Sequence, residues 1–290
     1  MAVQPNTQIA NITQQIQQNR QKSKPIEQLI QKSLSELGKA VPAHLNAERL
    51  VRIALTSLRR NPELAECTPE SFLGALFQSA QLGLEPDVEG QAYLIPFNNS
   101  KKIGDQWTKV KEVQFQIGYK GFIELFYRHK LAKSIDVHTV FEKDLFEFNY
   151  GTDASLKHCP KFTPNEDGKI NRCKPIGYYA IAKLNNDGNV FKFMNIDECM
   201  EHGTNHSKTY DKVKKEFSKT SPWVTERDAM CKKTVLKQLA KLLPKSIELQ
   251  KALAMDSTTK SRVSLDMFEV KDETNWTDDN VGSEKEIKNE

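Results

Sequence analysis

The residues best suited to chemistry are four lysines around one tryptophan, set between two apolar stretches of the chain. They are Lys101, Lys102, Lys109, Lys111 and Trp107. Ammonium groups neutralise phosphates, and an aromatic ring offers a face on which a base stacks, so this composition indicates contact with a single-stranded nucleic acid. A solvated hairpin whose tryptophan packs back on a sheet explains the same composition. The segment alone leaves both interpretations open.

A second basic group lies nearer the end of the chain. Residues 205–245 hold eleven Lys and Arg against four Asp and Glu. They include Lys215 and the clearest predicted helix, Trp223 to Leu243, which Pro244 ends. On a helical wheel the apolar residues share one side, and a basic stripe of Arg227, Lys233, Lys237 and Lys241 follows the other. The stripe is about 20 Å long, a length over which a nucleic acid presents several phosphates.

Lys232 departs from this pattern, because the wheel places it among the apolar residues. Burial of an unpaired ammonium group is costly. The side chain must therefore form an ion pair, extend to the solvent or line a polar groove. A structural salt bridge and a functional contact both remain open.

A third group of candidates lies where a helix is predicted to begin, after Gly118 and continuing to Lys130. The first backbone N–H groups of a helix attract anions, so Lys120 at this entrance is a candidate phosphate contact. Tyr119 beside it and Arg128 two turns later complete the group.

Alternation of side chains predicts the strands that position the first lysines. Tyr93, Ile95 and Phe97 alternate before them, and Val113, Phe115 and Ile117 alternate after them, as in half-buried strands joined by a long lysine-rich loop. Further strands are predicted within residues 137–150, 175–184 and 189–194, with a hairpin turn at Asn185–Gly188. Residues 151–175 read as a loop. We therefore expect one sheet of four or five antiparallel strands.

Helical periodicity and end signals occupy much of the remaining chain. The predicted helices cover residues 25–38, 46–61, 68–83, 196–201 and 247–255. The expected fold class is α+β, a small antiparallel sheet with a long hairpin, packed with several helices. We expect a disordered leader over residues 1–24, a core over 25–256, and an acidic, disordered tail over 257–290.

The charges are unevenly distributed. The net charge is +4, whereas residues 264–290 hold nine acidic residues and three lysines. That segment carries −6, which leaves +10 for residues 1–263. A basic body indicates a polyanionic partner, and the tail is expected to bind a separate partner or to shield the body.

Several other functions find little support in the sequence. Neither a phosphate-binding P-loop nor a dinucleotide-binding glycine motif is present. His202 and His206 lack the glutamate of a zinc-protease motif, and His158, Cys159 and Cys173 would need a fourth zinc ligand. The carboxylates Asp136, Glu142, Asp144 and Glu147 could hold magnesium in a nuclease, but no acid–acid–lysine cluster follows them. We expect no enzyme and no metal site.

Location is inferred from what the chain lacks. No apolar run approaches the length of a membrane span, and the first residues lack the apolar core of a secretory signal. The five cysteines are odd in number and contain no C-x-x-C pair. We therefore expect a reduced, cytoplasmic protein without a membrane partner.

Three long segments together resemble the RecT family of phage and prophage single-strand annealing proteins. They are AERLVRIALTSLRRNPELAECTPESFLGALFQSAQLGLEP, the pair AYLIPF and VQFQIGYKGFIEL, and SPWVTERDAMCKKTVLKQLAKLLPKS. The resemblance covers about residues 30–255. It implies a core like that of the eukaryotic and lambda Beta annealing proteins. It also implies a protein that coats single-stranded DNA and pairs complementary strands without ATP during phage homologous recombination.

The resemblance also implies partners. These are single-stranded DNA and the annealed duplex, further copies of the chain in a ring or helical filament, a phage 5′→3′ exonuclease and the host single-strand-binding protein. The compartment would be the cytoplasm of a bacterial host. No cofactor is expected to be required, with Mg²⁺ at most modulating DNA binding. A passive single-strand-binding protein and a magnesium-dependent nuclease are the competing functions.

Overall fold

The computed structural model describes residues 24–103, 106–162, 164, 168, 171–207, 209–244, 247–264 and 266–273. The expected leader, except residue 24, lies outside the described residues, as does the tail beyond residue 273. The contacts divide the expected core into two compact units. Among the described residues, unit 1 combines those within 24–87, 93–116 and 255–273, and unit 2 combines those within 88–92 and 117–254.

The helices of unit 1 confirm the predicted ends of the second and third helices, whereas the first, expected over residues 25–38, is interrupted at Ser33 and continues through Gly38 to Ala40. A helical segment over residues 24–32 is followed by α2 (Leu34–Ala40), α3 (Ala47–Arg60), the 3₁₀ helix η1 (Pro62–Glu66) and α4 (Pro69–Leu82). Asn46 caps α3 by accepting hydrogen bonds from two backbone N–H groups. Gly83 ends α4 in the left-handed conformation, with φ +60°. Nearly every residue of α4 is buried, which makes it the central helix of the unit.

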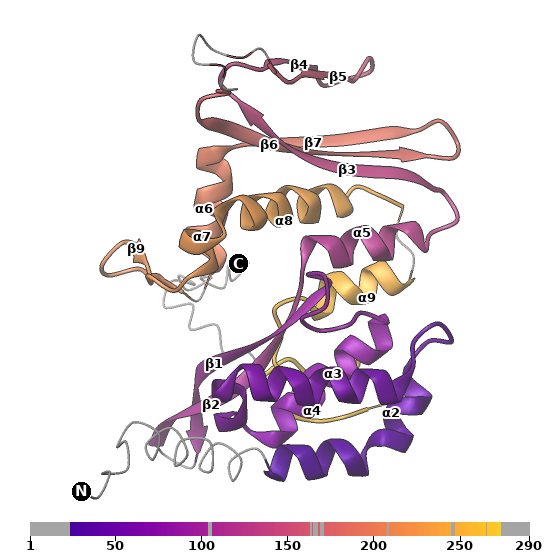
Figure 1. Ribbon diagram of the computed structural model, residues 1–290, viewed down its shortest axis with the longest axis vertical. Helices are drawn as coiled ribbons and strands as arrows, with labels where there is room; N and C mark the ends of the chain where they lie inside the picture. Colours follow the sequence, from indigo (N-terminus) through magenta and orange to yellow (C-terminus); the bar gives the residue numbers. More distant parts are fainter. Residues whose placement is uncertain are drawn as a thin grey trace, which may run out of the picture. The chain divides into compact units, whose positions relative to one another are not determined.

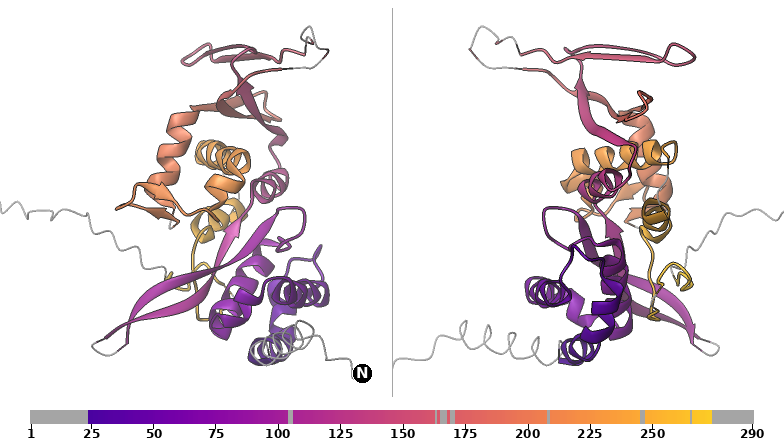
Figure 2. Two further views of the ribbon diagram at one scale, coloured as in Figure 1. Left: turned by 60° about the vertical axis from the view of Figure 1, so that its left-hand side comes forward. Right: turned by 90° about the vertical axis from the view of Figure 1, so that its right-hand side faces the viewer.

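Two long strands form the hairpin of unit 1. They are β1 (Ala92–Ile103) and β2 (Gln106–Ile117). The lysines expected in a loop therefore lie on strands. In both views of Figure 2 the outer ends of β1 and β2 extend away from the helices of their unit. The inner half of β2 is buried, whereas residues 106–109 are exposed.

Both faces of the inner half of β2 are covered, which the alternation did not predict. Val113, Phe115 and Ile117 are buried as expected, but Glu112 and Gln114 on the opposite face are only 1% and 2% exposed. Residues of the C-terminal segment cover that face: the Gln114 amide donates to the Ser257 carbonyl at 2.6 Å. The packed part of the chain thus continues beyond the expected boundary at residue 256, as far as residue 273.

Unit 2 is built on a three-stranded antiparallel sheet with strand order β3-β6-β7. The strands are β3 (Ala132–Phe141), β6 (Pro175–Leu184) and β7 (Asn189–Asn195), and the predicted turn at Asn185–Gly188 joins the last two. Helix α8 (Arg227–Ala240) lies against one face of the sheet (Figure 1). The other helices of the unit are α5 (Tyr119–Tyr127), α6 (Ile196–His206), α7 (Pro222–Thr225) and α9 (Ile247–Met255).

A separate two-stranded sheet covers the other face of the three-stranded sheet (Figure 1). It consists of β4 (Leu145–Asn149) and β5 (Ser155–Cys159). The Phe146 ring stacks on Tyr179, with centroids 5.7 Å apart, and also contacts Phe193. The expectation of one sheet of four or five strands was therefore wrong, and so was the loop over residues 151–175. Strand β5 forms there because it pairs with β4 and buries part of an aromatic layer.

A further short hairpin, β8 (Tyr210–Asp211) with β9 (Glu216–Phe217), precedes α7. The single helix predicted from Trp223 to Leu243 is interrupted at Glu226, which separates α7 from α8. Leu242, predicted on the apolar side, lies beyond the end of α8 and is 60% exposed. Within the described part of the chain, the helices lack the length and apolar character that a membrane span needs.

Candidate nucleic-acid interface

The outer half of the hairpin presents an aromatic ring next to a cation. Trp107 is 67% exposed, and Lys109, two residues further along β2, is exposed as well. Residues two apart in a strand point to the same face, so the ring and the ammonium group share one side of the hairpin. This arrangement can stack on a base and neutralise a neighbouring phosphate. The side chain of Lys102 lies outside the described residues.

Lys101 occupies a different environment from Lys109, although both belong to the hairpin. Its ammonium group lies 2.6 Å from a carboxylate oxygen of Glu112 and 2.6 Å from one of Glu273. Burial by itself lowers the pKa of Lys101, but the hydrogen bonds to these two carboxylates outweigh it and raise the pKa above its ordinary value. The Lys101 ammonium group is therefore charged and forms ion pairs with both carboxylates.

Lys111 is paired in the same way with the helical part of unit 1. Its ammonium group lies 3.0 Å from Glu66 and 3.4 Å from Glu63 of η1, and the hydrogen bond to Glu66 raises the pKa of Lys111. The next residues of β2 are anchored to α4 through the backbone, because Ser71 Oγ accepts from the Val113 N–H at 2.9 Å. The counting of lysines in the sequence did not reveal these acidic partners.

The candidates around α5 lie at its two ends. Gly118 precedes the helix, Tyr119 is half-buried in its first turn, and Lys120 is exposed. Arg128, at the end of the helix, contacts the Glu124 carboxylate at 3.4 Å, one turn away. Lys120 thus keeps the exposed position near a helix N-terminus that the sequence predicted.

The basic stripe of α8 is only partly exposed. Arg227, the first residue of the helix, and Lys241, just after its end, are exposed, whereas Lys233 and Lys237 are half-buried. The Lys241 ammonium group donates to the Gln238 side chain at 3.1 Å. In unit 2, Lys215 is exposed in the turn between β8 and β9, with φ +55°.

Lys232, which the sequence placed on the apolar side of the helix, forms an ion pair. Its ammonium group lies 2.6 Å from Asp228, one turn earlier on α8. The same carboxylate accepts a hydrogen bond from Thr139 of β3 at 2.8 Å. Pairing with Asp228 is therefore the first of the three options that the sequence left open.

The candidates consequently fall into two sets. Unit 1 holds Lys101, Lys102, Trp107, Lys109 and Lys111, and unit 2 holds Tyr119, Lys120, Arg128, Lys215, Arg227, Lys232, Lys233, Lys237 and Lys241. Trp107, Lys109, Lys120, Lys215, Arg227 and Lys241 are exposed.

Asp144, one of the four carboxylates considered for a nuclease site, has structural partners instead. The Asp144 side chain is fully buried and accepts hydrogen bonds from Arg172, from His158 and from the backbone of Lys161. The Arg172 guanidinium, more than any other group, holds the pKa of Asp144 well below its usual range. The Asp144 carboxylate is thus ionised, and both of its oxygens already accept hydrogen bonds from the protein.

The histidines also lack the surroundings of a metal site. His158 contacts Asp144 and the Tyr179 hydroxyl. The rings of His202 and His206 lie with centroids 4.4 Å apart and planes tilted by 45°. Burial, with smaller effects of His206, Lys237 and Lys241, lowers the pKa of His202 to about 4. Across the described residues, no group of three or more His, Cys, Asp or Glu is arranged to hold a metal ion.

Comparison with known proteins gives this geometry a context. The sequence model described as the RecT family matches residues 48–274. Protein RecT of Escherichia coli (strain K12) is 38% identical over 222 residues, which cover 76% of this chain and 75% of that protein. Uncharacterized protein YqaK of Bacillus subtilis (strain 168) is 28% identical over 216 residues, which cover 73% of this chain and 65% of that protein. The matched region includes the hairpin, α8 and the C-terminal segment up to residue 273.

Proposed function

The chain belongs to the RecT family, and from this premise we propose that it anneals complementary single strands of DNA without ATP. Family membership and the similarity to the Escherichia coli protein support a role in recombination and single-strand annealing. The observation that carries the mechanism is the exposed outer half of the hairpin, where Trp107 and Lys109 share one face.

Annealing requires a surface that binds phosphates and leaves the base edges available for pairing. Exposed cations supply such binding without sequence preference. In the proposed mechanism, Lys109 on the hairpin and Lys120, Lys215, Arg227 and Lys241 in unit 2 bind the backbone. The outer end of the hairpin enters the strand, and Trp107 stacks on a base. Repetition along an oligomer would hold the DNA extended in short stacks.

The proposed partners follow from the same role. They are single-stranded DNA, the annealed duplex, other copies of the chain in a ring or helical filament, a phage 5′→3′ exonuclease and the host single-strand-binding protein. We propose the cytoplasm of a bacterial host as the compartment. The proposed reaction breaks no covalent bond, so it needs no catalytic residue and no cofactor, and Mg²⁺ would act only on the strength of DNA binding.

A pairing assay tests this proposal. Two complementary fluorescent oligonucleotides are mixed with the purified protein, without ATP, at two salt concentrations and with or without Mg²⁺. We expect faster pairing of intact strands and a smaller acceleration at the higher salt concentration. Slower pairing would indicate a passive single-strand-binding protein. Strands shortened only in the presence of Mg²⁺ would indicate a nuclease.

A further inference from the structure

The C-terminal segment, residues 255–273, is an integral part of unit 1. It begins alongside β2, where the Phe115 N–H donates to the Thr258 carbonyl at 3.0 Å and the Ser257 N–H donates to the Phe115 carbonyl at 2.9 Å. The Gln78 amide of α4 donates to the Thr258 hydroxyl at 2.7 Å. The segment is thus bonded to the strand and to the central helix.

The segment then crosses α4 in close contact. A Cβ atom on Gly74 would lie 1.8 Å from the Lys260 carbonyl oxygen, so only glycine permits this crossing. The Lys260 side chain is 4% exposed and donates to the Met267 carbonyl, and Met267 is fully buried. The backbone N–H of Met267 donates to the Gln81 side chain of α4 at 2.8 Å. These contacts hold Lys260 and Met267 against α4.

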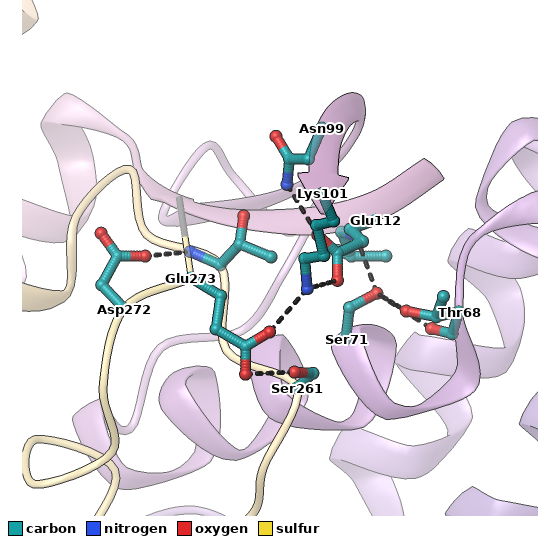
Figure 3. Close-up of polar contacts among 10 residues, drawn as sticks. Thr68, Ser71, Asn99, Lys101, Glu112, Ser261, Asp272 and Glu273 are labelled. Atoms are coloured by element: carbon teal, nitrogen blue, oxygen red, sulfur yellow. Dashed lines mark hydrogen bonds and ion pairs between the residues drawn. The ribbon is translucent and has the colours of Figure 1, made fainter. Parts of the chain in front are cut away.

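The end of the segment lies next to its beginning, and this arrangement positions the Glu273 carboxylate beside Lys101. The Glu273 N–H donates to the Thr259 carbonyl at 2.8 Å, and the Thr259 N–H donates to the Asp272 carboxylate at 3.0 Å. The Glu273 carboxylate accepts from the Ser261 hydroxyl and from Lys101. Figure 3 shows the Lys101 ammonium group between the Glu273 and Glu112 carboxylates.

Lys101 therefore connects the segment to the buried base of the hairpin. The Glu112 side chain is 2% exposed, and it also accepts from the Asn99 amide of β1 at 2.8 Å. A carboxylate this deeply buried needs a cation and hydrogen-bond donors to offset its desolvation. One ammonium group meets that need and at the same time binds Glu273. These residues lie where the covered half of the hairpin gives way to the exposed half.

We propose that Glu273 and Lys101 are positioning residues and that residues 255–273 act as a brace for the hairpin. This inference rests on the proposed function, in which the outer half of the hairpin enters the DNA strand. Trp107 lies five residues beyond Glu112, about 17 Å along an extended strand. An isolated two-stranded hairpin is only marginally stable in water. The brace on one face and the Lys111 pairs with η1 on the other hold its base, so that Trp107 and Lys109 are presented in one orientation.

The brace makes a different prediction from direct DNA binding by Lys101. If Glu273 merely shielded Lys101 from phosphates, its neutralisation would expose the cation and tighten DNA binding. If Glu273 braces the hairpin, its neutralisation loosens residues 97–112 and slows annealing. Glu273→Gln in the full-length protein separates the two outcomes.

The matched control is Glu269→Gln, because Glu269 is an exposed acidic residue of the same segment. Hydrogen–deuterium exchange of residues 97–112 without DNA, the annealing rate and the salt dependence of DNA affinity are measured for both variants. For Glu273→Gln we expect severalfold faster exchange and severalfold slower annealing, with the slope of log affinity against log salt unchanged. For Glu269→Gln we expect wild-type exchange and annealing. Lys101→Arg, which keeps the cation, should preserve most of the protection.

Two results would overturn the brace. One is tighter DNA binding by Glu273→Gln with unchanged exchange, which would make Lys101 a shielded phosphate contact. The other is faster exchange with an unchanged annealing rate, which would leave the contact without a positioning role. If the wild-type protein does not anneal DNA, the proposed function is wrong. The contact between Glu273 and the hairpin is still tested in that case, because hydrogen exchange of the hairpin is measured without DNA.

Discussion

Lys232 and Asp228, one turn apart on α8, form an ion pair of 2.6 Å, and Thr139 of β3 donates to the same carboxylate. The hydrogen bond from Thr139 connects the basic helix to the three-stranded sheet. The Lys232 cation is thus paired with a carboxylate, whereas Lys241, just beyond the end of the same helix, is an exposed residue whose ammonium group donates only to the neutral Gln238 side chain among the contacts described. Two lysines of one basic stretch therefore differ in their availability to DNA.

We predict that Lys241→Gln changes DNA binding more than Lys232→Gln does. Loss of a lysine that contacts phosphate reduces the slope of log affinity against log salt by about one. The slope should fall by that amount for Lys241→Gln and remain near the wild-type value for Lys232→Gln. Titration of fluorescent single-stranded DNA at four salt concentrations measures it. Equal slopes for the two variants would contradict the assignment.

Trp107→Ala should weaken the binding of single-stranded DNA without affecting the fold. Stacking of a base on an aromatic ring contributes about 1–3 kcal/mol, so the affinity should fall roughly tenfold. Because Trp107 is 67% exposed, the thermal unfolding midpoint should stay within a degree or two of the wild type. Trp107→Phe keeps an aromatic face and is expected to retain most of the affinity. A phenylalanine variant as weak as the alanine variant would argue against stacking.

Gly203 and Gly38 offer a matched test of packing, because both lie within helices. A Cβ atom on Gly203 would lie 2.8 Å from the ring of Trp223, which is buried. Gly203→Ala should therefore lower the free energy of unfolding by about 1–3 kcal/mol. A Cβ atom on Gly38 would meet no atom of the described residues within 4 Å, so Gly38→Ala should raise it by up to about 1 kcal/mol through helix propensity. Urea denaturation of both variants measures the difference in sign.

The brace should weaken in acid. Burial raises the pKa of Glu273, but the hydrogen bonds from Lys101 and Ser261 outweigh burial and lower the pKa below its ordinary value of 4.5. The stabilisation is therefore present above pH 4.5 and is lost as the pH falls through the lowered pKa. Lys101 has a raised pKa, so its contribution is present below pH 10.5 and is lost only above that value.

Hydrogen exchange of residues 97–112, corrected for intrinsic rates, should thus be protected equally at pH 6 and pH 8 and less well below pH 4. Glu273→Gln should remove this acid sensitivity, while Glu269→Gln should retain it. An acid sensitivity that persists in Glu273→Gln would assign the effect to another carboxyl group.

Local signals in the sequence predicted most of the helices and strands and part of the candidate nucleic-acid interface. Asn46, Pro69 and Gly83 mark helix ends because capping depends on neighbouring residues in the chain. The turn at Asn185–Gly188 and the alternation of Val113, Phe115 and Ile117 are local in the same sense. These patterns were sufficient for the fold class and for the exposed position of Lys120.

Long-range partners could not be read from such patterns. Glu273 is 172 residues from Lys101, and its sequence context is an acidic segment of the kind that is often disordered. The period-2 pattern therefore predicted that the face of β2 with Glu112 and Gln114 is open to solvent. In the structure, the C-terminal segment covers this face. Strand β5 was missed because its pairing with β4 and its aromatic contacts outweigh the weak strand preference of its own residues. A lysine count likewise contains no information about which carboxylates neutralise Lys101 and Lys111.

The crossing of residues 258–260 over Gly74 has a consequence for biosynthesis. Unit 1 takes its first helices from the beginning of the chain and its last segment from residues 255–273, whereas all of unit 2 lies between them. A ribosome completes unit 2 before it has made the residues that cover β2 and α4. The hairpin thus obtains its final support only after all of unit 2 has been synthesised, so a nascent chain that stops before residue 255 lacks the hairpin base that the folded protein contains.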